Sequence, residues 1–244
     1  MASGGLAFGR VGARGVTQSM ARKRQGQYHI TMSKASDQKT RTAYADLMQE
    51  IKVRLAAIEA ALRGDFRLSP PFVEDFCYLQ VRMIGELIAI ACLLAHGDIP
   101  ATQNSTLRTS WDADKILKTL AGLHSDFFPY PVKREHIASS KELPLGGIHM
   151  HDVPPGYLTK DEMLEFLGKV GNRLHRGSLK KVLKNLNTSR NNFPDIIKWH
   201  DKIVLLLNEH RIMFVDKHSF YYCALMEASM GNQVMVAYAE APQP

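Results

Sequence analysis

The chain has 244 residues, of which 45% are hydrophobic and 23% are charged. This balance excludes a disordered or collagen-like protein and provides enough apolar side chains for a sizeable core. The three cysteines lie far apart with no C-x-x-C pair, so we expect neither a disulfide framework nor a cysteine-based zinc site. A reducing cytoplasm is the expected location.

The formal net charge of +7 lies almost entirely at the start of the chain. Residues 1–36 contain Lys and Arg but no acid, because Asp37 is the first carboxylate. The remaining chain is nearly neutral and has no overall field that would steer it onto nucleic acid. We therefore expect any RNA or DNA binding to be weak and local.

Residues 1–36 are rich in glycine and show no apolar periodicity, which predicts a disordered basic tail. Three explanations stay open for it: a natural start at Met20 or Met32, an arginine-rich organelle transit peptide, and a basic arm for nucleic acid. No apolar run reaches the roughly 20 residues that a bilayer span requires, so no membrane anchor is expected. Residues 37–244 are expected to form one domain.

Helical periodicity dominates this domain. Residues 72–96 are apolar on almost all sides, which predicts a buried central helix. Ser110, Asp112 and Asp114 mark one helix start, and Thr159-Lys160-Asp161-Glu162 is a capping box for another. The predicted helices are 42–62, 72–96, from about 112 to before Phe127, 159 to about His175, a short basic helix at 178–186, and one from Pro194 to Leu207.

The last thirty residues change to β-branched and aromatic runs that are separated by turn residues. These runs predict an antiparallel meander with strands at 212–215, 220–226 and 234–239. Residues 132–157 are expected to be a long irregular connection with a short strand at 148–153. The predicted fold is mainly α within the α+β class, a multi-helix bundle around a buried central helix with a small three-stranded appendage at 211–240.

Arg82 and Glu86 interrupt the apolar core helix at a spacing of four residues, at which two side chains can pair. A buried arginine and carboxylate could orient His175, at the end of a later helix, or bind an anionic group. They could equally form a structural ion pair that fixes the helix register.

The pattern of Arg82 and Glu86 in an apolar helix, followed later by Leu174-His175 at a helix end, resembles HEPN-type helical domains of bacterial defence and toxin–antitoxin proteins. The resemblance spans about residues 40–210. Active HEPN ribonucleases share an R-x(4–6)-H motif, whereas one residue separates Arg173 from His175 here. The resemblance therefore implies an inactive, binding or structural version.

Two further patterns involve histidine and lysine. His149 and His151 would share one face of a strand, as a pair of metal ligands can, but no third ligand is identified and no metal site is predicted. The other pattern is a basic cluster without acids, which could follow phosphates or be a solvated face. Its predicted nucleic-acid-binding residues are Arg176, Lys180, Lys181, Lys184 and Arg190.

The sequence contains no nucleotide-binding, dinucleotide-binding, hydrolase or zinc-protease motif. It therefore predicts a non-enzymatic binding or interaction module without a cofactor, whose partner is a protein or, weakly, RNA or DNA. The alternative is a metal-independent, RNA-directed phosphodiesterase. Its predicted catalytic residues are His175 for proton transfer and Glu86, with Arg173, Arg176 or Arg82 to hold the phosphate.

Overall fold

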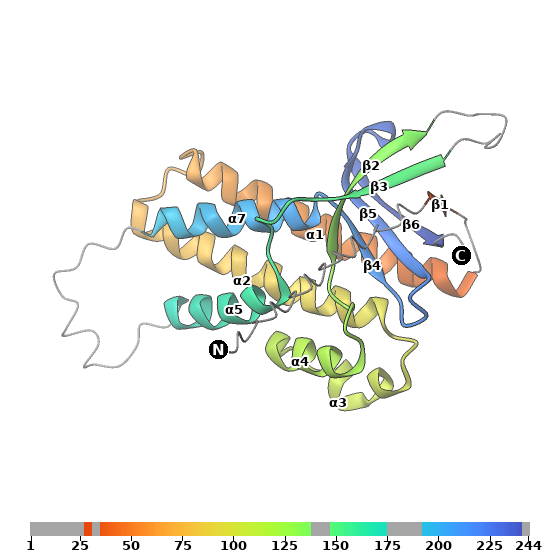
Figure 1. The fold of residues 1–244 in the computed structure, drawn as a ribbon. Helices are drawn as coiled ribbons and strands as arrows, with labels where there is room; N and C mark the ends of the chain where they lie inside the picture. The colour runs from red at the N-terminus through yellow and green to blue at the C-terminus, as the bar shows by residue number, and fades with distance from the viewer. Residues whose placement is uncertain (1–26, 31–34, 138–146, 175–191, 241–244) are drawn as a thin grey trace, which may run out of the picture.

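The computed structural model describes residues 27–30, 35–137, 147–174 and 192–240. They form an α+β fold in which helices pack beside an antiparallel sheet (Figure 1). The α+β class is therefore confirmed, although the sheet is larger than the predicted meander. The short basic helix predicted at 178–186 lies outside the described residues.

Helix α2 is the centre of the helical part, as predicted, and four other helices contact it directly. A single turn of 3-10 helix, η1 (Pro100–Gln103), and the short helix α3 (Ser105–Arg108) follow it in the chain. The long helices are α1 (Ala35–Leu62), α2 (Pro70–Ala95), α4 (Ala113–Leu123), α5 (Lys160–Leu174) and α7 (Phe193–Leu207).

The predicted capping signals are present at two helix starts. The Asp112 carboxylate accepts a hydrogen bond of 3.2 Å from the backbone N–H of Lys115 at the start of α4. At α5, the backbone N–H of Glu162 donates to Thr159 Oγ1 at 3.3 Å, and the backbone N–H of Thr159 donates to Glu162 Oε2 at 3.1 Å. This reciprocal pair is a complete capping box, so local sequence defines where α5 begins.

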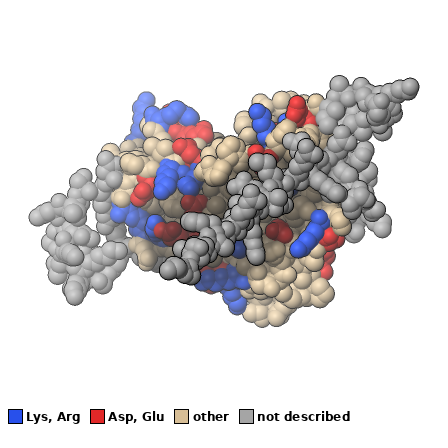
Figure 2. All heavy atoms as spheres, in the orientation of Figure 1, with Lys and Arg blue, Asp and Glu red and all other residues tan. Residues whose placement is uncertain are grey.

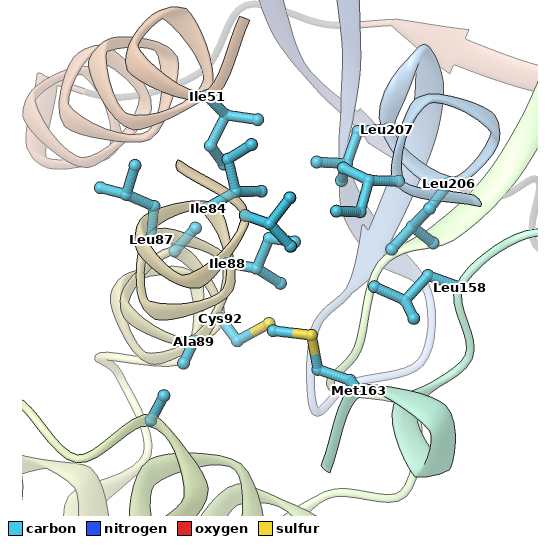
Figure 3. Close-up of a cluster of buried hydrophobic side chains, with 14 of the residues drawn as sticks. Ile51, Ile84, Leu87, Ile88, Ala89, Cys92, Leu158, Met163, Leu206 and Leu207 are labelled. Carbon is cyan, nitrogen blue, oxygen red and sulfur yellow. The ribbon is translucent and has the colours of Figure 1, made fainter. Parts of the chain in front are cut away.

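The main core lies between the helices, and Figure 3 shows side chains of α1, α2, α5 and α7 meeting there. Ile84 and Ile88 of α2 are fully buried, as are Ile51 of α1 and Leu206 of α7. The spacing of four residues between Ile84 and Ile88 places both on one helix face. Burial of such apolar side chains supplies the main stabilisation of the helical part.

Five strands form a continuous antiparallel sheet in the order β3-β2-β4-β5-β6, and β1 pairs with both β3 and β6 to close a barrel. The three C-terminal runs predicted as strands overlap β4, β5 and β6, but β4 begins and ends earlier than the predicted run at 212–215. The strands are β1 (Gln27–Ile30), β2 (Tyr130–Ile137), β3 (Gly147–Asp152), β4 (Glu209–Met213), β5 (Ser219–Glu227) and β6 (Gln233–Glu240).

The prediction of an irregular connection over residues 132–157 is wrong for its first part, which forms β2. The short strand expected at 148–153 is present as β3, and the two strands pair over six residue positions. The alternation of β2 is hard to recognise because a charged residue replaces an apolar one on the covered face. Arg134 lies opposite the buried Met150, whereas its neighbour Glu135 is exposed and lies opposite His149. A polar side chain on each face hides the period of two by which strands are identified.

Strand β1 corrects a second prediction, since it lies within the tail of residues 1–36 for which disorder was expected. Only Gln27–Ile30 of that tail is described as a strand, and each half of it pairs with a different neighbour. Such a short strand is held by backbone pairing and needs no apolar alternation. The sequence pattern therefore contains no signal for it.

A second, smaller apolar cluster forms among the strands, and an ion pair lies near one of its members, Tyr222. The Arg134 guanidinium lies 2.8 Å from Glu227 Oε2, and both side chains are largely buried. The same guanidinium lies 5.6 Å from the centre of the Tyr222 ring. The covered arginine of β2 is thus paired, as burial of a charge requires.

Among the described residues, α2 is the one helix that is long and apolar enough to cross a membrane by length and composition. Its most apolar window has a mean hydropathy of 1.7, and 56% of that window is buried inside the protein. A core helix has the same properties. The expected absence of a membrane anchor remains a prediction.

Candidate functional site

Arg82 and Glu86 form the ion pair that their spacing predicts, with Arg82 Nε 2.9 Å from Glu86 Oε1. Their predicted burial in the core is wrong, because the side chains are 34% and 25% exposed. They lie at the edge of the helical core and line a groove between α2, α5 and the start of α4. A groove of this kind can receive a ligand, whereas a core ion pair cannot.

The packing of α5 explains why the pair is uncovered. A Cβ atom on Gly85 of α2 would lie 2.8 Å from the Leu167 side chain, so the missing side chain lets α5 approach closely at this point. Directly after Leu167 and one turn further along α5, Gly168 and Gly171 carry no side chains, and a Cβ atom on either would meet nothing within 4 Å. The two helices therefore touch at Gly85 and leave space beside it.

This space, which we call the Trp111 groove, has a volume of about 290 Å³. Trp111 stands at its rim with 77% of its surface exposed, although it is one of only two tryptophans in the chain. The groove is lined by Arg82, Glu86, Trp111, Asp112, Ala113, Asp114, Leu164, Leu167, Gly168 and Gly171.

The charges of the groove are predominantly acidic. Glu86, Asp112 and Asp114 contribute three carboxylates, whereas Arg82 is the single basic residue in the lining. Each of these carboxylates also has a local role. Glu86 pairs with Arg82, Asp112 caps α4, and Asp114 pairs with Lys118 at 2.6 Å. An acidic groove beside an exposed indole face suits a cation, which the carboxylates and the ring both attract.

Arg173 lies elsewhere and has a different partner. It forms a salt bridge with Glu74, whose side chain is only 3% exposed, and its guanidinium lies 5.6 Å from the centre of the Tyr78 ring. The Asn192 side-chain amide donates to the same Glu74 oxygen at 2.9 Å. Arg173 therefore ties the end of α5 to the first turns of α2.

Two of the arginines predicted as alternatives for holding a phosphate, Arg82 and Arg173, thus lie in different places. Arg82 pairs with Glu86, and Arg173 pairs with Glu74. Glu74 lies eight residues before Arg82 on α2, which is about 12 Å along the helix axis. The two guanidinium groups serve separate carboxylates. The other predicted site residues lie outside the described residues: His175, Arg176, Lys180, Lys181, Lys184 and Arg190.

The histidine pattern of β3 has the geometry expected of a strand. The rings of His149 and His151 lie 4.4 Å apart between centres, and His151 Nε2 is 2.5 Å from Glu135 Oε2 on β2. This contact helps to lower the pKa of the Glu135 carboxyl below its usual range. Within the described ranges, no three His, Cys, Asp or Glu side chains are grouped so that they could hold a metal ion.

Sequence reasoning missed Glu74 and Trp111. Glu74 is near a helix start, where an acid is normally solvated, and nothing in the sequence indicates that α5 and Asn192 cover it. Trp111 does leave a signal, because a large aromatic residue between Ser110 and the helix cap Asp112 stands outside the apolar face of α4. A tryptophan outside the core pattern is typical of a contact surface.

The rest of the visible surface carries mixed charge. On the face drawn in Figure 2, Lys and Arg side chains lie beside Asp and Glu side chains over the helices. No family model, curated protein or solved structure matches the chain. The function is therefore argued from the geometry of the site.

A modest effect is expected when the Arg82–Glu86 pair is broken. Exposed and half-exposed pairs of this spacing contribute roughly 0.3–1 kcal/mol, because water replaces the lost partner. Arg82→Met and Glu86→Gln should each change the free energy of unfolding by less than about 1 kcal/mol in a urea titration. A loss above about 3 kcal/mol in both variants would instead indicate a buried pair.

Proposed function

We propose that the protein is a non-enzymatic interaction module that holds a basic side chain of a partner protein in the Trp111 groove. The observation that carries this proposal is the position of a largely exposed tryptophan beside three carboxylates. Tryptophan and arginine are the residue types that most often dominate the binding energy of protein interfaces. An arginine from the partner would match both the ring and the acids.

The chemistry favours arginine over other side chains. A guanidinium group can lie flat on an indole ring, and its N–H groups can donate to a carboxylate; Trp111 and Glu86 offer both in the lining of the groove. A cation on an exposed ring contributes about 0.5–1 kcal/mol to the free energy of binding, and a hydrogen bond to a charged group contributes about 1.5–3 kcal/mol. One such anchor gives weak binding by itself, so the partner is expected to contact the surrounding surface as well.

The same charges disfavour the alternative phosphodiesterase at this groove. Three carboxylates line this groove and repel a phosphate. The HEPN resemblance implies an inactive or binding version of that fold, which is compatible with an interaction module. A nuclease role for His175 remains a prediction from the sequence.

A titration with small probes tests the proposal. The chain contains two tryptophans, Trp111 and the largely buried Trp199, so two indole N–H signals are expected in a ¹⁵N correlation spectrum. N-acetyl-arginine amide should shift the Trp111 signal in a saturable way and leave the Trp199 signal in place. N-acetyl-glutamate amide is the control and should have no effect on either signal.

Two results would contradict the proposal. One is a Trp111 signal that does not respond to the arginine probe, and the other is an equal response to the glutamate probe. The variant Glu86→Gln adds a second test. Loss of one charge-assisted hydrogen bond should lower the affinity for the arginine probe about tenfold. Asp98→Asn removes an acid outside the groove and should leave the affinity unchanged.

A further inference from the structure

A second cavity lies where the barrel meets the helices and is separate from the Trp111 groove. Four connections and strand ends form it: the loop before β2, the loop before α5, the end of β4 and the turn between β4 and β5. Its volume is about 620 Å³. We call it the tyrosine cleft, and its walls include Phe128, Tyr130, Tyr157, Lys160, Arg211 and Lys217.

Aromatic rings and a guanidinium group meet in this cleft. Tyr130 and Tyr157 pack edge to face, with ring centres 6.0 Å apart and an angle of 72° between the planes. The Arg211 guanidinium lies 5.2 Å from the centre of the Tyr130 ring. Such an arrangement provides flat surfaces against which a further planar ring can stack.

Rigid elements hold these groups in place. Tyr130 of β2 and Arg211 of β4 are directly opposite each other in the antiparallel register. Tyr157 lies next to Leu158, whose side chain is fully buried and whose backbone N–H donates to the Lys202 carbonyl at 3.0 Å. The cleft is therefore preformed, as small-molecule sites usually are.

The charge of the cleft is mainly positive. Lys160, Arg211 and Lys217 line it, against the single acid Asp126. Asp152 also acts on Tyr130, where it adds to the effect of burial and raises the pKa of the phenol. Within the described part of the chain, Lys160 and Lys217 form no ion pair, so both remain available to an anion.

The turn that carries Lys217 is itself fixed. Lys217 has a positive φ of 58°, and the Asp216 carboxylate accepts hydrogen bonds from the backbone N–H groups of His218 and Ser219 at 2.9 and 2.8 Å. These bonds lower the pKa of the Asp216 carboxyl against the opposing effect of its burial. Lys217 thus stands on a stable turn at the edge of the cleft.

The start of α5 does not supply the anion site, although Thr159 and Lys160 line the cleft. The side chains of Thr159 and Glu162 already satisfy backbone N–H groups at this helix start. Attraction for an anion therefore comes from Lys160 and Lys217. The proposed anion binding therefore does not depend on the general attraction between helix N-termini and negative charge.

We propose that the tyrosine cleft binds a nucleoside monophosphate, with the base stacked against the tyrosines and Arg211 and the phosphate held by Lys160 and Lys217. Its volume suits a ligand of this size. Stacking tolerates any base, because every base has a flat π face, so little discrimination among bases is expected. A planar carboxylate shares the required chemistry and serves as a comparison below.

Calorimetric titration of the full chain with adenosine 5′-monophosphate tests this site. Uridine and guanosine monophosphates should bind within about tenfold of it. Adenosine, which lacks the anion, and ribose 5-phosphate, which lacks the ring, should each bind at least about tenfold more weakly. Tighter binding of benzoate than of the nucleotide would assign the cleft to aromatic acids and overturn the proposal.

Single substitutions test whether the nucleotide binds in the tyrosine cleft. Lys217→Asn removes the charge while asparagine tolerates the positive φ, so the fold should persist and affinity should fall about tenfold. Tyr157→Leu should cause a similar loss by removing the ring. Lys115→Gln, an exposed lysine on α4 outside the cleft, should change nothing.

Three further outcomes would overturn the inference: no heat of binding at millimolar nucleotide, binding that survives both cleft variants, or adenosine that binds as tightly as its monophosphate. A single-stranded RNA that binds far more tightly than the monophosphate would replace the proposed ligand with a nucleic acid. The result does not depend on the Trp111 groove, because arginine probes should leave nucleotide affinity unchanged.

Discussion

Arg173→Met is expected to lower the free energy of unfolding by about 3–5 kcal/mol. Arg173 is the main partner of Glu74, whose side chain is almost completely buried. Without the guanidinium, the hydrogen bond from Asn192 is the one contact that the carboxylate keeps among the described residues, and its charge lies in a covered position. Breaking one side of a buried pair typically has this cost. Equilibrium unfolding in urea at neutral pH measures it.

The control for this prediction lies on the same helix. Lys169 pairs with Glu165 at 2.5 Å, but both side chains are more than half exposed. Lys169→Met should therefore change stability by less than about 0.5 kcal/mol. Equal effects of Arg173→Met and Lys169→Met would refute the structural role of Arg173 and return it to the candidates for phosphate binding.

Acidification from pH 7 to pH 4 is expected to cost about 3 kcal/mol of stability through His210 alone. Burial lowers the pKa of His210 from about 6.5 to about 4. Its Nδ1 faces the Leu207 carbonyl at 3.0 Å, and its Nε2 lies 2.9 Å from the Tyr44 hydroxyl, so the neutral ring donates to the first and accepts from the second. Protonation would break the second bond.

The loss of stability on acidification follows from proton binding at His210. Between the two pKa values, the unfolded chain binds a proton at this histidine and the folded chain does not, so stability falls as the pH falls. The stabilisation that neutral His210 provides is complete above about pH 6.5 and is lost by about pH 4. Burial also lowers the pKa of His96, so His96 adds to the loss of stability as the pH falls.

Urea midpoints measured across this pH range test the assignment. His210→Gln should be less stable at pH 7 but should lose less on acidification than the wild type. His218→Gln, at an exposed turn, is the matched control and should retain the full wild-type pH dependence. A pH profile of His210→Gln identical to that of the wild type would show that other groups dominate.

The sequence predicts the helical part well because its signals are local. The capping box at Thr159 and the aspartate cap at Asp112 mark where α5 and α4 begin, and the apolar composition of α2 predicts its central position. Each signal depends only on neighbouring residues. The C-terminal strands β4, β5 and β6 are predicted for the same reason.

The failures involve contacts between distant segments. β2 is missed because Arg134 takes a covered strand position, where its partner Glu227 is 93 positions away in the chain. The exposure of Arg82 and Glu86 depends on glycines of α5, and the burial of Glu74 depends on Arg173 and Asn192. Periodicity identifies which residues share a face, but it does not show what lies opposite them.

The Trp111 groove can be closed selectively, which gives the most direct test of the interaction module. Gly168 lies in the groove, and Gly122 lies on the exposed side of α4; at both helical positions a Cβ atom would meet nothing within 4 Å. Gly168→Leu should therefore fill the groove without disturbing the fold, and Gly122→Leu should add the same side chain harmlessly elsewhere.

The decisive measurement is the titration of N-acetyl-arginine amide into these two variants and the wild type, followed at the Trp111 indole signal. We expect the saturable shift to persist in the wild type and in Gly122→Leu and to be lost in Gly168→Leu. An unchanged response in a folded Gly168→Leu variant would contradict the claim that this groove is the binding site.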